Sequence, residues 1–266
     1  MLIDSHVHIN HDFFNGKENL YIQESKKSNI NLFLCVGWDL KSSQKAVQLS
    51  KQFNEVFACV GIHPEEIKNM KEHDFEEIEK LIKNKKVIAI GEIGLDFFRE
   101  KSDYFREKQK EYFVKFIQLA NKYNLPVVIH SRNAYLEAYE LLKKYNVQKK
   151  GVIHCCCLED ERLVDDFLKI GFFFGFGGVV TFKNSLGIKK CVAKIPLEKI
   201  LLETDAPFLT PEPFRGHINH SKYLNYIVDA ISSIKHKNFH EIENQTMNNF
   251  NNLFFYNANK FSRDFK

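Results

Sequence analysis

The chain has no apolar run long enough to cross a membrane. Its longest candidate, residues 171–182, is shorter than the ~18 residues that a spanning helix needs, and it is rich in glycine. Linkers rich in proline or serine, internal repeats and low-complexity tracts are also missing, and no signal peptide is visible. The sequence therefore argues against a membrane protein, and we expect a cytoplasmic one.

Cysteine pairs of the CxxC type are absent as well. Three of the six cysteines are consecutive, Cys155, Cys156 and Cys157, and neighbouring residues of a strand point to opposite faces. This spacing builds neither a disulfide framework nor a zinc site of CxxC pairs. Reduced thiols in a cytosolic protein are the simplest interpretation.

Basic residues do not form a dense stripe, although the net charge is +4 at pH 7. The densest group lies around a predicted helix end and comprises Lys143, Lys144, Lys149 and Lys150. We interpret this group as a solvated face, with a track for phosphate groups as the alternative. The charge is compatible with an anionic ligand but does not require one.

The chain is instead rich in apolar residues, which make up 44% of its 266 residues and include 25 phenylalanines. Eight short apolar runs alternate with longer amphipathic stretches, and such runs are typical of strands buried on both faces. The runs begin at Leu2, Asn31, Val56, Val87, Pro126, Gly151, Gly171 and Lys199. The clearest helical pattern starts near Ser102 and stops before Leu125-Pro126; the others cover 42–53, 74–84, 133–145, 159–169 and 221–235.

Eight strands joined by crossovers indicate parallel pairing, in either an open doubly wound sheet or a closed barrel. Polar or glycine clusters follow seven of the eight runs. In a (β/α)8 barrel all carboxyl ends open onto one mouth and the first and last strands adjoin, whereas an open sheet would separate His6 from Asp205. We therefore predict the α/β class and a (β/α)8 TIM barrel, as a single domain over residues 1–266 with a C-terminal helical segment.

His6 and His8 are the most informative pair of polar residues. Their spacing on a strand places both imidazoles on one face, pointing into the barrel. Two core histidines bonded to backbone are the structural alternative to a shared metal ion. Four further ligand-type residues follow other runs and favour the metal: Glu92, His130, His154 and Asp205.

Six candidate ligands suggest two divalent cations, because a single catalytic zinc needs only three protein ligands. We expect Glu92 to bridge the cations, His6, His8 and Asp205 to complete one site, and His130 and His154 to complete the other. Such a pair suits in-line displacement at phosphorus. The mixed shell leaves the identity of the metal open between Mg, Mn and Zn.

The motifs around these residues resemble the ordered signature of the TatD family of metal-dependent deoxyribonucleases. The resemblance covers residue 2 to about residue 225 and rests on HVH (6–8), GIHP (61–64), GEIGLD (91–96), VIHSR (128–132), HC (154–155), ETDAP (203–207) and FRG (214–216). It implies the same six metal ligands and a DNA substrate, as single strands or 3′ ends. The chain departs from the family after Cys155, where an aromatic, Ser or Thr, and Gly usually follow; here Cys156, Cys157 and Leu158 stand, either packed as small hydrophobes or sensitive to soft metals and oxidation.

We predict Glu92, Asp205 and His63 as the catalytic residues. Asp205 would take a proton from the attacking water, and His63 would donate to a phosphate or leaving oxygen. Asp96 either orients a ligand histidine or caps a turn. Other residues near the strand ends carry open alternatives: Arg132 (phosphate binding or a salt bridge), Gly175-Phe176-Gly177-Gly178 (close approach to a ligand or a tight turn), Arg215 (a loop anchor) and His11 (a solvated loop residue).

The sequence is compatible with three alternative functions. The first is a hydrolase of DNA phosphodiester bonds, expected to act as a monomer and as a 3′–5′ exonuclease. The second is an amidohydrolase acting on a cyclic amide, lactone or ester; relatives of that kind often bridge two metals with a modified lysine, and the fourth run ends in Glu92 instead. The third is a non-catalytic binding protein, against which the complete ligand set argues.

Overall fold

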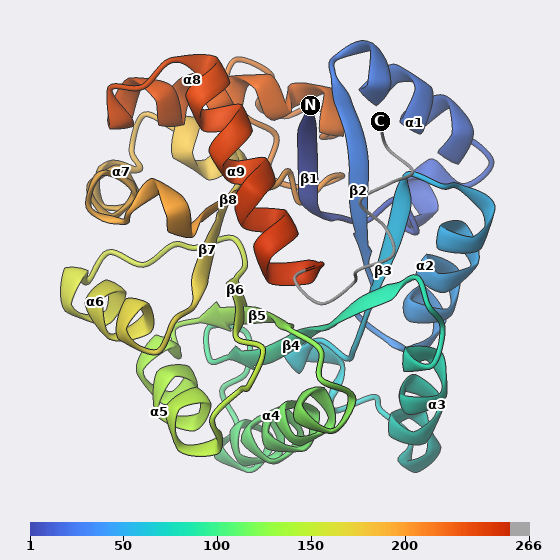
Figure 1. Ribbon diagram of the computed structural model, residues 1–266. Coiled ribbons are helices and arrows are strands. Elements are labelled where there is room, and N and C mark those ends of the chain that lie inside the picture. The colour runs from blue at the N-terminus through green and yellow to red at the C-terminus, as the bar shows by residue number, and fades with distance from the viewer. Residues whose placement is uncertain (256–266) are drawn as a thin grey trace.

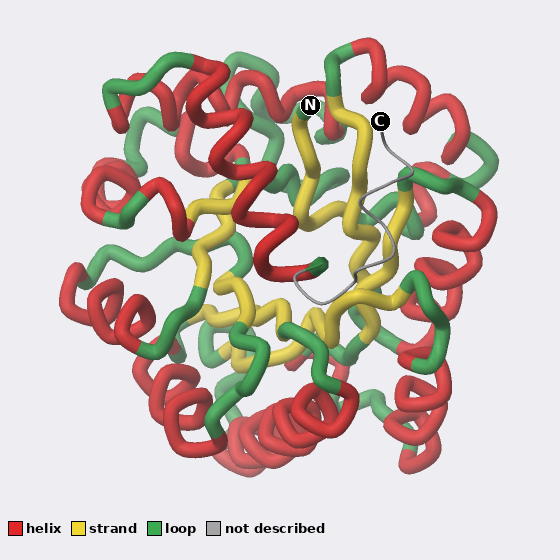
Figure 2. The backbone as a smooth tube through the Cα atoms, viewed as in Figure 1, coloured by secondary structure: helices red, strands yellow, loops and turns green. Residues whose placement is uncertain are grey.

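Eight parallel strands form a barrel in the computed structural model, which describes residues 1–255 apart from the side chain of Glu72. Each strand is hydrogen-bonded to the next in the order of the sequence, and the strands make an inner ring with helices outside it (Figures 1 and 2). The strands are β1 (Leu2–Val7), β2 (Ile30–Val36), β3 (Val56–Val60), β4 (Val87–Asp96), β5 (Val127–Arg132), β6 (Gly151–Ile153), β7 (Phe173–Phe176) and β8 (Ile200–Leu202).

Hydrogen bonds join the last strand to the first. Ser5 Oγ donates to the carbonyl of Leu202 at 2.8 Å, and the amide of Asp205 donates to the carbonyl of His6 at 3.0 Å. Buried Asp4 on β1 accepts from both the amide and the hydroxyl of Thr204, just beyond β8. These contacts confirm the predicted (β/α)8 barrel and exclude the open sheet.

The helices surround the barrel and follow the sequence pattern in most places. They are α1 (Glu18–Lys27), α2 (Leu40–Gln52), α3 (Glu72–Ile82), α4 (Asp103–Tyr123), α5 (Tyr135–Tyr145), α6 (Glu161–Lys169), α7 (Leu186–Lys194), α8 (Leu224–Lys235) and α9 (Phe239–Phe254). In the described part of the chain no helix is both long and apolar enough to cross a membrane. The sequence pattern does not indicate α1 or α7, because each buries only a few apolar side chains.

Helix α9 closes one end of the barrel. Its Phe250, Leu253 and Phe254 pack into a buried cluster with inward-facing apolar residues of the strands. The Asn249 amide donates to the carbonyl of Ile200 at 2.7 Å, at the first residue of β8, so the closed end is the amino end of the strands. Figure 1 shows α9 lying across the ring of strands. A site within the barrel is therefore reached from the carboxyl ends.

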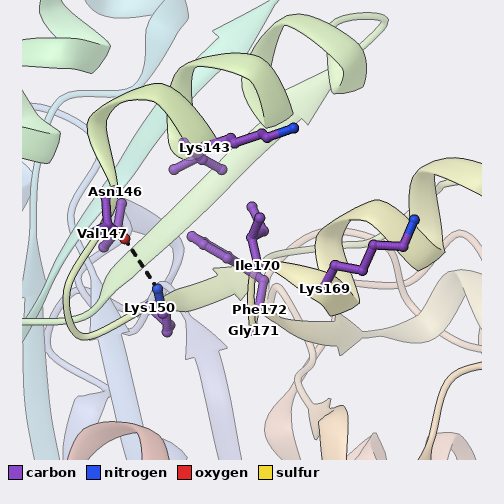
Figure 3. Close-up of a pocket in the computed structure, with 9 residues that line it drawn as sticks. Lys143, Asn146, Val147, Lys150, Lys169, Ile170, Gly171 and Phe172 are labelled. Carbon is purple, nitrogen blue, oxygen red and sulfur yellow. Dashed lines mark hydrogen bonds between the residues drawn. The ribbon is translucent and has the colours of Figure 1, made fainter.

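The lysine-rich region lies at the amino end of the strands, away from that opening. A pocket of about 220 Å³ is found there, between the ends of α5 and α6 and the residues that precede β6 and β7. Lys143 and Lys169 point away from this pocket, whereas Lys150 lies 3.4 Å from Asn146 Oδ1 (Figure 3). This arrangement fits a solvated face and does not support a phosphate track that leads to the barrel mouth.

Strand β4 is longer than its apolar run suggests. The run covers 87–90, but the strand continues to Asp96 with all ten residues buried. Gln109 of α4 supports the far end of this strand, because its side-chain oxygen accepts from the amide of Asp96 at 3.0 Å. The same side chain donates to the carbonyl of Pro64 at 3.2 Å. A single buried glutamine thus fixes both the end of β4 and the loop that carries His63.

Candidate metal centre

The carboxyl ends of the strands open onto a cavity of about 800 Å³, the barrel mouth. Five of the six predicted ligands line this cavity, and the sixth, His6, is fully buried beneath it. The predicted catalytic residue His63 lines it as well. Sequence positions spread over two hundred residues are therefore brought to one place by the barrel.

One side of the centre is built from β1 and the residues after β8. The Nε2 atoms of His6 and His8 lie 3.3 Å apart, as two residues on one face of a strand should. Closure of the barrel brings Asp205 next to them, with Oδ1 3.2 Å from His8 Nε2 and 3.7 Å from His6 Nε2. These three side chains form the first predicted set.

Glu92 of β4 lies between the two sides of the centre. Its Oε1 is 2.9 Å from His130 Nδ1, and its Oε2 is 3.4 Å from His6 Nε2. Two oxygens of one carboxylate therefore face histidines on different strands, which is the position that a bridging ligand requires. His154 Nε2 lies 3.7 Å from Glu92 Oε1 and 3.8 Å from Asp205 Oδ1, so it adjoins both sides rather than that of His130 alone.

The donor atoms fit divalent cations. Donors that share one cation at ~2.0–2.2 Å lie roughly 3–3.5 Å apart, and the His6–His8 and His8–Asp205 donor pairs are 3.3 and 3.2 Å apart. The buried rings of His6 and His154 stack with centroids 3.4 Å apart, and His6 Nδ1 has no hydrogen-bond partner within the described residues. Such crowding of buried imidazoles is costly unless a cation compensates it.

Hydrogen bonds fix which nitrogen each histidine presents. His8 Nδ1 lies 2.9 Å from the carbonyl of Val36, so it carries the proton and leaves Nε2 for a metal. His130 Nε2 lies 3.0 Å from Asp96 Oδ2, which leaves Nδ1 facing Glu92. Asp96 thus orients His130, a predicted ligand, and it also caps a turn by accepting from the amide of Arg99, so both predicted roles fit its contacts.

Glu203 forms an ion pair with His154 and was not among the predicted site residues. Its Oε1 lies 2.9 Å from His154 Nδ1 and accepts from the amide of Cys155 at 2.5 Å. The side chain is 1% exposed, and Gly175 of β7 makes room for it: a Cβ at that position would lie 2.1 Å from Glu203 Oε2. The signal was present as two acids, two residues apart, after the eighth run.

Comparisons with known proteins show the family of the chain. A family model described as TatD related DNase matches residues 3–255. The chain belongs to the TatD family. It is 35% identical over 254 residues to the uncharacterized metal-dependent hydrolase YabD of Bacillus subtilis (strain 168), a match that covers 96% of this chain and 99% of the relative.

Solved structures give the same result for the fold. The crystal structure of the TatD homologue YjjV from Escherichia coli K12 matches with a TM-score of 0.90 at 26% identity, covering 95% of this chain and 97% of that one. A second sequence relative, the uncharacterized metal-dependent hydrolase YcfH of Escherichia coli (strain K12), is 28% identical over 263 residues, which cover 97% of each chain. The sequence resemblance is thus confirmed, and the chain is a metal-dependent hydrolase of the TatD family.

Charges in the TatD centre are strongly coupled in the absence of cations. Although burial opposes it, Glu203, Glu92 and Asp205 raise the pKa of His154 to about 10. Burial is likewise outweighed at His130, where hydrogen bonds to Asp96 and Glu92 raise the pKa to about 9. Against the effect of burial, the surrounding histidines hold the pKa of Glu92 well below its usual range.

Metal binding should therefore release protons. At pH 7 the rings of His130 and His154 are positively charged, each with a proton on both nitrogens. A cation must displace one of these two protons, because only neutral imidazole is a ligand. We expect about two protons released per chain at pH 7, and an affinity that rises between pH 6 and pH 8 by up to about a hundredfold per pH unit. Calorimetric titration with Mn²⁺ in buffers of different ionisation enthalpy measures both quantities. An affinity independent of pH would contradict this electrostatic account.

His63 is neutral at pH 7, unlike His130 and His154. Burial and the neighbouring His130 lower its pKa to about 3, so the ring is neutral at pH 7. Its Nδ1 accepts from the amide of Glu65 at 3.2 Å, which places the proton on Nε2, 3.6 Å from Glu92 Oε1. His63 is thus set to donate a hydrogen bond into the mouth.

The residues with open alternatives lie around this centre. Arg132 stacks its guanidinium on Phe98 at 3.9 Å and lines the mouth, and the described residues include no ion-pair partner for it. Arg215 anchors a loop by donating to the carbonyl of Thr210. Gly178 allows close approach of the backbone of Leu209, a residue that lines the mouth.

His11 is a partly exposed loop residue, as we expected, but it also has aromatic neighbours. It lines the mouth, and its ring stacks on Phe13 with centroids 4.8 Å apart. It also contacts Trp38 and Phe208, at centroid distances of 5.7 and 5.4 Å. His11, Trp38 and Phe208 line the mouth, and Phe13 adjoins them through His11; these four residues are called the aromatic wall.

Proposed function

We propose that the chain is a metal-dependent phosphodiesterase that hydrolyses DNA, removing nucleotides from single strands or 3′ ends in the 3′–5′ direction. The observation that carries the proposal is the position of Glu92 between two groups of imidazole and carboxylate donors. Two bound cations, Mg, Mn or Zn, would activate water and neutralise charge on phosphoryl oxygens. Family membership as a TatD related DNase supports the same reaction class.

The chain itself would supply one group that accepts a proton and one group that donates a hydrogen bond or proton. Asp205 Oδ1 lies within 3.8 Å of nitrogens of His6, His8 and His154, so one oxygen is held at the centre while the carboxylate remains ionised. Against burial, the hydrogen bond to His8 lowers the pKa of Asp205, and we assign it as the group that accepts a proton from water. His63 Nε2–H is the assigned donor to a phosphoryl or leaving oxygen.

The two sides of the mouth suit a single nucleic acid strand. The aromatic wall offers ring faces on which bases stack whatever their sequence. Phe13 and Phe208 leave 54% and 46% of their surface exposed, so these faces are accessible. Arg132 and Arg99 line the same cavity and supply positive charge for a phosphate backbone.

Truncation of the wall should weaken substrate binding. We expect Phe208→Ala to raise the KM for a single-stranded oligonucleotide by about 5- to 150-fold, since one base stack contributes ~1–3 kcal/mol, with kcat nearly unchanged. Tyr104→Ala is the matched control, because Tyr104 is 65% exposed but does not line the mouth. Steady-state kinetics on both variants separate these outcomes; equal KM values would remove the wall from the substrate site.

An assay of end-labelled oligonucleotides tests the reaction itself. With Mg²⁺ or Mn²⁺, a 5′-labelled single strand should shorten from its 3′ end one nucleotide at a time, and a chelator should stop the reaction. Internal cuts would retain the nuclease but overturn the exonuclease direction. Turnover of cyclic amides, lactones or esters without any cleavage of DNA would favour the amidohydrolase instead.

A further inference from the structure

The loop that follows β6 carries three consecutive cysteines in unequal surroundings. Cys156 is 3% exposed and packs into the hydrophobic core, as a small hydrophobe would. Cys155 and Cys157 line the barrel mouth, and Cys157 is exposed. Only part of the triplet therefore matches the first sequence interpretation, and the pair Cys155/Cys157 requires another explanation.

The backbone brings these two thiols together. Cys155 has a left-handed conformation, with φ at +43°, which turns the chain within the triplet. The amide of Cys155 donates to Glu203 Oε1, and the amide of Cys157 donates to the hydroxyl of Tyr135 at 3.0 Å. With both ends held, the thiols of Cys155 and Cys157 lie close enough for each to shift the pKa of the other.

We propose that Cys155 and Cys157 form a reversible disulfide on exposure to a hydroperoxide, as a modification site at the mouth of the metal centre. Two thiols that are separated by one residue, flank a turn and line the same cavity need little movement to bond. The proposal is independent of the substrate of the hydrolase.

The chemistry has two steps. The Cys157 thiolate attacks one peroxide oxygen, the O–O bond breaks, and the products are a sulfenic acid on Cys157 and hydroxide, which takes up a proton to become water. Cys155 sulfur then attacks the Cys157 sulfur, the S–O bond breaks, and hydroxide leaves with the Cys155 proton as a second water. In total, two thiols and hydrogen peroxide give one disulfide and two waters. A small dithiol reverses the bond by exchange.

Access distinguishes Cys157 from the other thiols. Cys35, Cys59, Cys156 and Cys191 are buried. Burial raises the pKa of Cys35 to about 12, whereas Cys157 is exposed and lines the mouth. The first oxidation should therefore occur at Cys157, with Cys155 as the resolving partner.

Peptide mass spectrometry tests the proposal without relying on activity. The full chain is treated with a slight excess of hydrogen peroxide, unfolded, alkylated and digested with trypsin, which releases residues 151–162 as one peptide with all three cysteines. We expect this peptide to lose two hydrogens and to carry a single alkyl group, on Cys156. Dithiothreitol before alkylation should restore three alkyl groups.

Variants locate the bond. Cys156→Ala should keep the disulfide, whereas Cys155→Ser and Cys157→Ser should each prevent it, and Cys155→Ser should leave a sulfenic acid on Cys157 that dimedone captures. Circular dichroism shows whether each variant is folded. Three alkylated cysteines after peroxide, a bond that involves Cys156, or only sulfinic and sulfonic products in the wild-type chain would each overturn the proposal.

Discussion

Glu92→Gln should abolish hydrolysis, lowering kcat by on the order of a thousandfold or more, because metal-ion stabilisation of the transition state amounts to several kcal/mol. The amide has nearly the shape of the carboxylate but no charge. It would leave His6 and His130 without the acid that they face at 3.4 and 2.9 Å. We expect bound metal to fall from about two equivalents per chain to one or fewer.

Glu65→Gln is the matched control for this variant. Glu65 lines the same mouth and is 41% exposed in its side chain, but its carboxylate pairs only loosely with Arg99, at 3.9 Å. The contact of Glu65 with His63 is made by its backbone amide, which the substitution preserves. The activity and the metal content of Glu65→Gln should stay within about twofold of wild type. Glu92→Gln with wild-type metal content and activity would remove Glu92 from the centre.

Gly175→Ala should strongly destabilise the barrel. The new Cβ would lie 2.1 Å from Glu203 Oε2 and 2.7 Å from its carboxyl carbon, both deeply buried. Either β7 or Glu203 must move, and Glu203 is the partner of His154 Nδ1. We expect a loss of at least about 3 kcal/mol in the free energy of unfolding, from overpacking and a broken polar contact, together with weaker metal binding.

Gly177→Ala provides the control on the same strand end. Its nearest neighbour would be the carbonyl of Glu203 at 3.4 Å, an ordinary contact, so stability and metal affinity should change little. Urea denaturation and metal titration measure both quantities. If Gly175→Ala does not fold, Glu203→Gln tests the same contact, with an expected loss of about 10- to 100-fold in metal affinity. Wild-type behaviour of both Gly175→Ala and Glu203→Gln would contradict the role assigned to Glu203.

The barrel and the positions of its ligands could be predicted because local rules decide both. Continuous apolar runs give strands buried on both faces, and ligand-type residues after them must meet once the sheet closes. His6, His8 and Asp205 meet for this reason. The length of β4 was underestimated because Glu92 and Asp96 interrupt its apolar pattern while their side chains face the polar centre.

The partners of the ligands depend on packing between strands, which the sequence pattern does not contain. Glu203 reaches His154 only because β7 lies beside β8 with a glycine at position 175. His11 joins the aromatic wall because the chain after β1 turns toward Trp38, a contact between two loops. Helix α1 was missed since most of its surface is polar and only Tyr21 and Ile22 among its apolar side chains are buried.

Anomalous diffraction from crystals grown with Mn²⁺ would test the central claim most directly. The account predicts two peaks at the barrel mouth, ~3.5–4 Å apart, with one oxygen of Glu92 or both shared between them. Donors from the other five predicted ligands should complete the two shells. A lone peak without Glu92 among its ligands, or density for manganese only elsewhere on the molecule, would contradict the account.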